Sequence, residues 1–424
     1  MSYPKLIIIF IFFGLSFAQR SVNDFIEPPA FDAAYDIFQG DKLQTTPDSI
    51  SLVKGETKQI TYTFSGNLTK AIKVYFNTTA NNIRLNPNVF TISPNLKEGS
   101  LNATGLDVTS RTFIDVYKCE ILDGSGNDTC PFNKTESFVR VKVIHSHAIE
   151  ILVSVTGWIY FVAWSISFYP QIYLNWKRGS VEGLNFDFLV LNIIGFACYT
   201  VYNWLMFFDH SVQDLYIQKH ERALIPVLTN DVVFATHALL ACIITGVQCF
   251  FYERGQQKIS YTCMGWGSIL IAFSAISFAI TIFSVIDWLQ FINNLSYVKM
   301  AVTLSKYFPQ VILNIRRKST VGWSIGNVVL DFTGGSMDIT QMILQASNTD
   351  DWSGFYGNPV KFGLGLVSMI FDIVFLIQHY CIYRNSDSDV SYDVVQTTDN
   401  SSTRTLTNPA ETSTSTIESP TGHY

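Results

Sequence analysis

Seven apolar runs constrain this chain more than any other feature. They cover approximately residues 148–170, 186–208, 231–251, 262–283, 288–313, 325–346 and 362–383, and each reaches the roughly 20 residues that a helix needs to cross a bilayer. Charged residues fill 26 of the 238 positions from 146 to 383, but 27 of the 127 positions from 19 to 145. The sequence therefore predicts an all-α membrane domain of seven transmembrane helices, residues 146–383, behind a more polar N-terminal domain.

The N-terminal part has the pattern of a secreted, glycosylated domain. Residues 1–18 combine Lys5, an apolar run and a small-residue pattern at Ser16-Phe17-Ala18, which predicts a signal peptide, with a first membrane anchor as the alternative. Residues 19–145 alternate in the manner of β-strands. They contain five glycosylation acceptor sequences, at Asn67, Asn77, Asn102, Asn127 and Asn133. Cys119 and Cys130 are expected to form a disulfide there. We expect a glycosylated β-rich luminal domain with a protective or interactive role.

Charge outside the apolar runs predicts the orientation. Basic residues follow the first, third and fifth runs, at Lys177, Arg178, Arg254, Lys258, Arg316, Arg317 and Lys318. Such residues mark cytosolic loops, so the N-terminus is expected in the lumen and the C-terminus in the cytosol. Residues 384–424 are rich in Ser and Thr and are expected to be a disordered cytosolic tail. Within it, Tyr392 to Val395 fits the Tyr-x-x-bulky pattern of sorting signals, although chance matches are frequent. The net charge of −6 excludes a generally basic nucleic-acid binder.

An internal repeat gives the most specific signal. Tyr-Pro-Gln-Ile-Tyr-Leu-Asn at 169–175 matches Phe-Pro-Gln-Val-Ile-Leu-Asn at 308–314, an offset of 139 residues that continues without gaps through Gly183/Gly322 and Asn192/Asp331. Both motifs fall at the same end of the membrane domain, which predicts two parallel three-helix repeats, 148–251 and 288–383, joined by a linker helix at 262–283. This is a transporter architecture with a binding site between the halves. Proline weakens the helix before it, so hinges are expected at Pro170, Gln171, Pro309 and Gln310. The alternative is that each proline marks a kinked helix end.

Charged residues within the apolar runs are candidates for function because each is costly in a bilayer. Lys299 and Lys306 lie seven residues apart and so share a helix face, as do Asp331 and Asp338. Together with Asp372 and the amides of Asn192, Asn314 and Asn327, they suit a solute bearing both carboxylate and ammonium groups, meaning an amino acid. An internal structural Lys–Asp pair, of Lys306 with Asp331 or one that involves Asp338, is the alternative. An enzyme is not expected, since neither a metal-ligand spacing nor a catalytic set is present, and no metal or other cofactor is predicted.

The same residues carry a resemblance to a known family. Residues 157–171, Lys306 to Gln310, Gly322 to Asn327 and Asp331 to Gly335 resemble the Pro-Gln-loop (PQ-loop) family, and its lysosomal cystine carriers in particular. The resemblance implies proton-coupled export of cystine from the lysosome lumen to the cytosol by alternating access. It implies cystine contacts at Trp164, Phe168, Asn192, Lys299, Lys306, Asn314, Asn327, Asp331 and Lys361, and proton-linked roles for Asp231, Asp331 and Asp372. The implied partners are cystine, protons, the lysosomal membrane, sorting adaptors and cytosolic nutrient-sensing complexes.

Three alternatives remain at this level. A seven-span receptor would share the topology but predicts no internal repeat, and a sugar carrier of this family would not need two buried lysines. Another amino-acid carrier of the same architecture would need them. Two features depart from the resemblance. Asp338 sits where the family pattern has no acid and receives no role, and 29 residues follow the Tyr392–Val395 motif, which weakens its case as a sorting signal.

Overall fold

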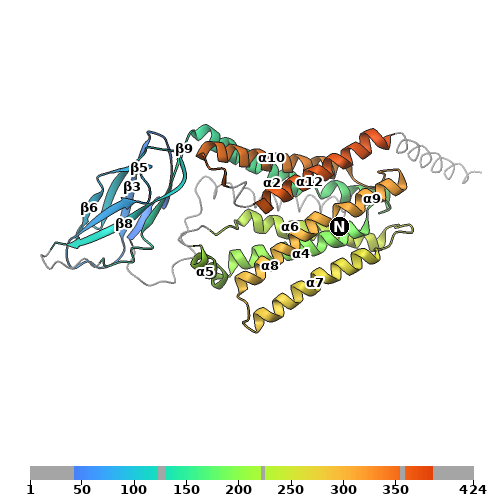
Figure 1. Cartoon of the computed structure of the whole chain (residues 1–424), viewed down its shortest axis with the longest axis horizontal. Coiled ribbons are helices and arrows are strands. Elements are labelled where there is room, and N and C mark those ends of the chain that lie inside the picture. Colours follow the sequence, from blue (N-terminus) through green and yellow to red (C-terminus); the bar gives the residue numbers. More distant parts are fainter. Residues whose placement is uncertain (1–42, 123–129, 221–224, 354–358, 385–424) are drawn as a thin grey trace, which may run out of the picture.

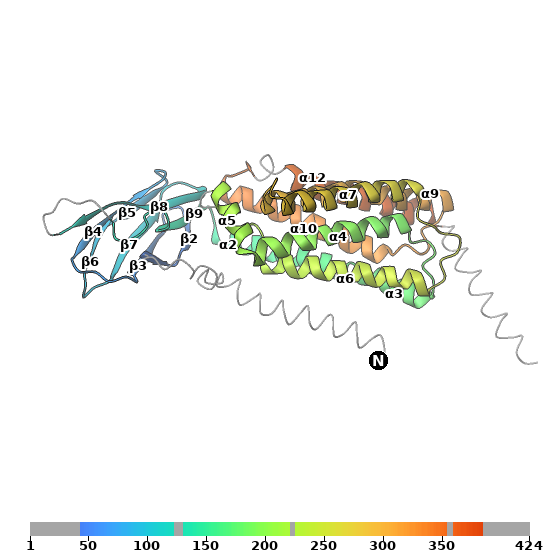
Figure 2. The same cartoon turned by 90° about the horizontal axis from the view of Figure 1, so that it is seen from below.

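The computed structural model describes residues 43–122, 130–220, 225–353 and 359–384. The predicted signal peptide, Asn127 and the Tyr392–Val395 motif lie outside the described residues. The molecule is elongated, with a β-sandwich at one end and a bundle of helices running lengthwise beside it (Figures 1 and 2). We call the two ends of the bundle the β-domain end and the far end.

Two sheets make up the β-domain. One has the order β1–β3–β7–β5 and the other β2–β9–β8–β4–β6. The alternation predicted for this region is visible in β3, where Ile60, Tyr62 and Phe64 are buried and their neighbours are more exposed. The strands are Leu43–Thr46 (β1), Ser49–Val53 (β2), Thr57–Phe64 (β3), Ile72–Thr78 (β4), Ile83–Asn86 (β5), Val89–Ile92 (β6), Glu98–Gly105 (β7), Thr109–Ile121 (β8) and Phe138–Ile144 (β9).

The bundle is built mainly from long helices that follow the predicted apolar runs, whereas the short helix His210–Lys219 falls between the second and third runs. The helices are His147–Ile166 (α2), Tyr169–Arg178 (α3), Phe186–Phe208 (α4), His210–Lys219 (α5), Thr229–Phe251 (α6), Tyr261–Ile282 (α7), Trp288–Ser305 (α8), Tyr307–Arg317 (α9), Ile325–Thr349 (α10) and Pro359–Ile377 (α12), which continues as a π-helical turn at Gln378–Ile382. Within the described residues, five segments are long and apolar enough to cross a membrane: His147–Arg178, α4, α6, α7 and Gly365–Ile382. The helices α8 and α10 do not meet this criterion; α8 carries Lys299 and ends just before Lys306, and α10 carries Asp331 and Asp338.

The two halves of the bundle interlock. We call α2, α3, α4 and α6 repeat 1, and α8, α9, α10 and α12 repeat 2. The first helix of each repeat packs most extensively on the second helix of the other, α2 on α10 and α8 on α4. The linker helix α7 lies against α8 and α4. Because the halves share these contacts, the space between them belongs to both repeats.

Each repeat has the same helix break before its proline. The helix α2 ends at Ile166 and α8 ends at Ser305, four residues before Pro170 and Pro309 respectively. Proline lacks an N–H and its ring clashes with the carbonyl four residues earlier, which accounts for both end points. The breaks place the short helices α3 and α9 at the far end of the bundle.

Polar contacts connect the β-domain to one end of the bundle. His147 at the start of α2 contacts the Glu56 carboxylate (Nε2 to Oε2, 2.9 Å), and Lys142 of β9 pairs with Glu150 at 3.2 Å. Near the end of α10, the Asn348 side chain accepts a hydrogen bond from the backbone N–H of Ser146 at 2.9 Å. The β-domain is therefore held against the paired ends of α2 and α10.

Candidate functional site

A cavity of about 800 Å³ lies between the two repeats. Its lining extends to Asp231 at the start of α6 and to Asn293 near the start of α8, both toward the β-domain end. In the other direction the lining stops at Gln171 and Trp323. Aromatic side chains make up much of the wall, while the charged groups come from few positions.

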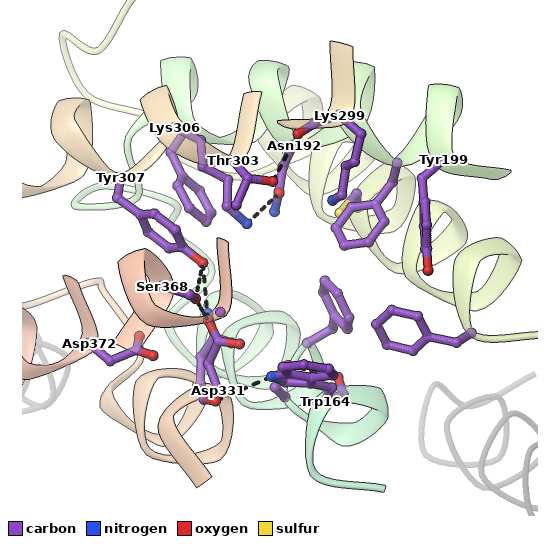
Figure 3. A pocket seen from close by; sticks show the side chains of 18 of the residues that line it. Trp164, Asn192, Tyr199, Lys299, Thr303, Lys306, Tyr307, Asp331, Ser368 and Asp372 are labelled. Carbon is purple, nitrogen blue, oxygen red and sulfur yellow. Dashed lines mark hydrogen bonds between the residues drawn. The ribbon is translucent and has the colours of Figure 1, made fainter. Parts of the chain in front are cut away.

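The two predicted lysines, Lys299 on α8 and Lys306 at the break just after it, project into this cavity (Figure 3). The Lys299 amine lies 3.6 Å from the centre of the Phe196 ring, a distance typical of a cation–π contact. The Lys306 amine donates a hydrogen bond to Asn192 Oδ1 at 3.1 Å and lies 4.6 Å from the centre of the Tyr307 ring. Among the described residues neither lysine forms a salt bridge with a carboxylate. The alternative of a structural Lys306–Asp331 pair is therefore wrong for this conformation.

The carboxylates face the lysines from α10 and α12. Asp331 Oδ2 accepts hydrogen bonds from Tyr307 at 3.2 Å and from Ser368 at 3.3 Å, and its backbone carbonyl accepts one from Trp164 Nε1 at 3.3 Å. Asp372 is 1% exposed, and its Oδ2 atom has no hydrogen-bond partner among the described residues. Figure 3 shows Asp331 and Asp372 across the cavity from the two lysines.

Gln171 and Gln310, which follow the two prolines and which we call the PQ glutamines, form matched hydrogen-bond networks at the far end. Gln171 donates to Asn175 Oδ1 (2.8 Å) and Asn175 donates to Gln248 (2.9 Å). In repeat 2, Gln310 donates to Asn314 Oδ1 (2.9 Å) and Asn314 donates to Gln378 (2.9 Å). The first network therefore joins α3 to α6 in repeat 1, and the second joins α9 to the end of α12 in repeat 2.

Each PQ glutamine also reaches across to the other repeat. Gln171 donates to the Gly322 carbonyl at 3.0 Å and accepts from the Ser324 N–H at 2.8 Å. Gln310 donates to the Gly183 carbonyl at 3.0 Å and accepts from the Asn185 N–H at 2.8 Å. We call these four bonds the far-end brace. They hold the repeats together between the cavity and the far end of the bundle.

Two glycines allow the backbones to approach in the brace. Gly183 and Gly322 have φ angles of +101° and +96°, a region that side chains disfavour. A Cβ at Gly183 would collide with the Val321 carbonyl, and one at Gly322 with the Glu182 carbonyl. The close contact of the two loops therefore requires glycine at both positions.

The structure brings most of the predicted site residues together. The cavity lining includes Trp164, Phe168, Asn192, Lys299, Lys306, Asn327, Asp331, Asp231 and Asp372. It does not include Asn314, which the break before α9 turns toward α12, where it is 0% exposed and bonded to Gln378. Lys361 lies on α12, but its side chain is outside the described residues.

Several cavity residues were missed by sequence reasoning. Tyr307 and Ser368 hold the Asp331 carboxylate, and Phe196 supports Lys299. Aromatic residues are so common in the apolar runs that composition alone gives no signal for these positions. The repeat offset could have found Tyr307, since it corresponds to the predicted contact residue Phe168.

The predicted sites of the β-domain lie away from the cavity. Cys119 of β8 and Cys130 are joined by a disulfide. Four of the five acceptor asparagines lie in described parts of the chain, and all four are exposed: Asn67, Asn77, Asn102 and Asn133. Their amides are accessible, and glycosylation stays a prediction.

Comparison with known proteins identifies the repeats. The model of the PQ loop repeat matches residues 152–212 and 291–351, two segments that lie 139 positions apart, as predicted. These segments include α4, α10, most of α2 and α8, and the whole break around each proline.

Relatives match over a larger part of the chain. A "Cystinosin homolog" of Caenorhabditis elegans is 52% identical over 288 residues, which cover 68% of this chain and 70% of that protein. "Cystinosin" of Bos taurus is 40% identical over 380 residues, 89% of this chain and 96% of that protein. The "Cystine transporter" of Saccharomyces cerevisiae is 32% identical over 263 residues, 56% of this chain and 96% of that protein. By its two repeats and these similarities, the chain belongs to the cystinosin family of PQ-loop membrane proteins.

Proposed function

We propose that this protein is a cystine–proton symporter that exports cystine from the lysosome lumen to the cytosol by alternating access. One observation carries the proposal. The cavity presents two lysines on one wall and carboxylates on the other, without salt bridges between them among the described residues. Cystine carries two carboxylates and two ammonium groups, so it complements both walls. The names of the relatives support the same substrate.

The aromatic wall supports a compact zwitterion with an apolar centre. Trp164, Phe168 and Phe196 line the cavity between the charged groups. A disulfide packs favourably against aromatic rings because sulfur is polarisable. A neutral sugar would leave the lysines without partners, which is costly for buried charged groups.

The proposed proton carriers are Asp331 and Asp372, with Asp231 nearer the β-domain end. A carboxyl group can donate a hydrogen bond only when it is protonated. Asp372 Oδ2 is buried without a hydrogen-bond partner in the described part of the chain, and Asp372 lies on the same side of the cavity as Asp331. Two carboxylates in one buried place do not readily carry charge at the same time, so one of them is suited to hold a proton that travels with the solute.

The paired helix breaks and the far-end brace support alternating access. In this conformation the cavity reaches toward the β-domain end, while the brace joins the repeats at the far end. We infer that the brace opens when the α3 and α9 segments swing at the Pro170 and Pro309 breaks. The transported solute would then leave at the far end.

We place the β-domain end in the lumen and the far end in the cytosol, with seven membrane crossings. Basic residues gather at the far end, including Lys177 and Arg178 at the end of α3 and Arg316 and Arg317 at the end of α9. On this reading residues 19–145 form a luminal glycosylated domain and residues 384–424 a cytosolic tail. Adaptors that recognise Tyr392–Val395 and nutrient-sensing complexes would meet that tail.

Uptake of labelled cystine tests the proposal. The protein is displayed at the cell surface, so that the outer medium replaces the lumen, and uptake is compared at pH 5.5 and 7.4 (on the order of two pH units). We expect uptake well above background at acidic pH and a several-fold drop at neutral pH. Absence of cystine uptake at both pH values would contradict the substrate, and equal uptake would contradict the proton coupling.

A variant pair separates the proton from the solute. We expect Asp372→Asn, which mimics a permanently protonated side chain, to make cystine exchange insensitive to outside pH. Asp209→Asn is the matched control, because Asp209 caps α5 through Ser211 and Val212 and does not line the cavity. Retention of the full pH response in Asp372→Asn would remove Asp372 from the coupling.

A further inference from the structure

Two histidines flank the connection between β9 and α2, where the β-domain meets the bundle. His145 and His147 stand on either side of Ser146, the residue that caps α2. His145 Nε2 lies 2.8 Å from Asp350 Oδ2 at the end of α10. His147 Nε2 lies 2.9 Å from Oε2 of Glu56, in the turn between β2 and β3. Neither histidine belongs to the described cavity lining, so both stand apart from the proposed transport site.

His147 lies between two carboxylates. Its Nε2 atom faces Glu56 Oε2 at 2.9 Å, and its Nδ1 atom faces Glu150 Oε2 at 3.2 Å. A neutral imidazole has one N–H and one nitrogen with a lone pair, whereas an ionised carboxylate can only accept hydrogen bonds. A neutral ring would therefore turn a lone pair toward one of the two carboxylates. Only the ring with a proton on both nitrogens donates to Glu56 and Glu150 together.

The other oxygen of each carboxylate faces a lysine. The Lys58 amine of β3 lies 3.4 Å from Glu56 Oε1. The Lys142 amine of β9 lies 3.2 Å from Glu150 Oε1. Carboxyl groups ordinarily lose their proton near pH 4, whereas histidine changes its charge between about pH 5 and pH 8. Both carboxylates are thus ionised throughout the range in which the His147 ring gains or loses its second proton.

We propose that docking of the β-domain onto the bundle depends on pH, because His147 joins Glu56 to Glu150 only while both of its ring nitrogens carry a proton. The docked state favours the charged ring. Its stabilising contribution is therefore present at acid pH and is lost as the pH rises through the range in which histidine loses a proton, about pH 5 to pH 8. His145 acts in the same direction, since its bond to Asp350 is an ion pair only when the ring is charged.

Other contacts at this junction do not titrate in that range. The Asn348 side chain accepts from the Ser146 N–H at 2.9 Å and donates to the Ser146 carbonyl at 3.1 Å, and the His145 N–H donates to the Asn348 carbonyl at 3.0 Å. These bonds hold the connection itself against α10. We therefore expect pH to change how firmly the β-sandwich is held on α2, while the connection stays in place.

This inference goes beyond the proposed function, because the docking does not depend on which solute the cavity binds. With the β-domain in the proposed lysosomal lumen, its docking would be complete in that acidic compartment. At the neutral pH outside a cell the same contact would be weaker. The protein would then respond to luminal pH at a place separate from the carboxylates of the cavity.

Distances between two spin labels test the docking. The labels are attached to Asn88→Cys, in the exposed turn between β5 and β6, and to Gln218→Cys, exposed on α5, after Cys381→Ser removes an exposed free cysteine. The protein is purified into lipid nanodiscs, and the distances are recorded by pulsed electron paramagnetic resonance at about pH 5.5 and about pH 7.5, on either side of the ordinary histidine titration.

With His147 in place, we expect one narrow distance at the acid pH. At the neutral pH we expect about fivefold more of a broad population, in which the β-domain has left its docked position. The change is modest for two reasons. The side chains of His147, Glu56 and Glu150 are 31% to 44% exposed, so water screens their attraction. The ion pair of Lys142 with Glu150 also persists at neutral pH.

Substitutions at His147 separate its charge from other effects of pH. His147→Arg is positive at both pH values and is expected to give the narrow distance at both. His147→Gln is neutral at both and is expected to show the broad population at both. His210→Gln is the matched control, because His210 is exposed at the start of α5 and its side chain forms no hydrogen bond or ion pair in the described part of the chain. It should keep the full response to pH.

The comparison gives clear grounds for rejection. A narrow distance at both pH values with His147 in place would overturn the proposal, even if the variants did not fold. A full pH response in His147→Arg, or a narrow distance at neutral pH in His147→Gln, would overturn it as well, since the ring charge would then not control the docking. The two proposals fail separately: absence of cystine uptake contradicts the proposed function, whereas the label distances decide the docking.

Discussion

The two repeats share a scaffold but differ in chemistry. At the far end they are nearly interchangeable, because each contributes a PQ glutamine, an asparagine four residues later and a glutamine from its third helix to the same network. Inside the cavity they diverge, since both lining lysines and three of the four lining aspartates, Asp331, Asp338 and Asp372, come from repeat 2. Symmetry is retained where the halves close on each other and lost where a solute would bind.

The difference has a physical basis. A brace that must open and close benefits from equal bonds on both sides, so that neither half is left with an unpaired buried amide. A site for an asymmetric arrangement of charges needs cations on one wall and anions on the other. Tyr160, Ser167, Asn192 and Tyr199 of repeat 1 supply hydroxyls and an amide, which can orient the lysines and a solute without adding charge to the bilayer interior.

The largest expected effect on cystine uptake comes from removing the Asp331 carboxylate, which has an uncharged counterpart in repeat 1. Asp331→Ala removes the carboxylate that accepts hydrogen bonds from Tyr307 and Ser368, and leaves these two hydroxyls bonded to each other (2.7 Å) across from Lys306. We expect cystine uptake to fall by two orders of magnitude or more, about 3 kcal/mol, with normal delivery to the membrane. Asn192→Ala, at the equivalent position of repeat 1, is expected to lower uptake by about tenfold. Near-normal uptake in Asp331→Ala would remove this residue from the mechanism.

The symmetry of the brace makes the opposite prediction. Gln171→Ala and Gln310→Ala each remove two bonds to the other repeat and leave a buried N–H and C=O without partners. We expect each variant to lose about 2 kcal/mol of stability, seen as nearly equal drops in the thermal midpoint of the purified protein.

The control for the brace is another glutamine that joins the repeats. Gln341→Ala loses one bond, from Gln341 Nε2 to the Val153 carbonyl at 2.9 Å, between α10 and α2 near the β-domain end. We expect this variant to lose roughly 1 kcal/mol of stability. Its thermal midpoint should therefore fall by about half as much as in Gln171→Ala and Gln310→Ala. Clearly unequal drops for Gln171→Ala and Gln310→Ala would show that the brace is not symmetric in energy.

The sequence predicts the scaffold well because its signals are local. Apolar runs and proline positions mark the helices, and the ends of α2 and α8 four residues before Pro170 and Pro309 follow from the chemistry of proline alone. The alternating pattern likewise predicts the β-rich domain. The repeat offset, which the PQ loop model matches independently, establishes the two halves.

The details of the site depend on packing that no local pattern encodes. The sequence places Lys306 and Asp331 on facing segments but cannot tell whether they pair. In the structure Lys306 donates a hydrogen bond to Asn192, and Asp331 accepts one from Tyr307. Asn314 resembles a binding residue by type and depth, yet the turn of α9 directs it away from the cavity, into the hydrogen-bond network with Gln310 and Gln378. The sequence assigns no role to Asp338, and the structure places it in the cavity lining.

The docking of the β-domain involves one helix from each repeat, and it gives the smallest predicted effect. The β-domain contacts the paired ends of α2 and α10, through residues such as Glu56 and Asn348. The Val53 N–H donates to Glu56 Oε2 at 2.7 Å and His147 lies beside it, so these groups lower the Glu56 pKa below its ordinary value of 4.5.

A carboxyl group whose pKa is lowered by folding stabilises the folded protein at pH values above its ordinary pKa, and this contribution is lost as the pH falls through the lowered value. We therefore expect the thermal midpoint to drop more steeply below about pH 4.5 in the unaltered protein than in Glu56→Gln, by about 1–3 °C. Glu98→Gln, an exposed change at the start of β7, serves as the control and should keep the steep drop. An identical acid response in Glu56→Gln and the unaltered protein would mean that Glu56 does not hold the β-domain against α2.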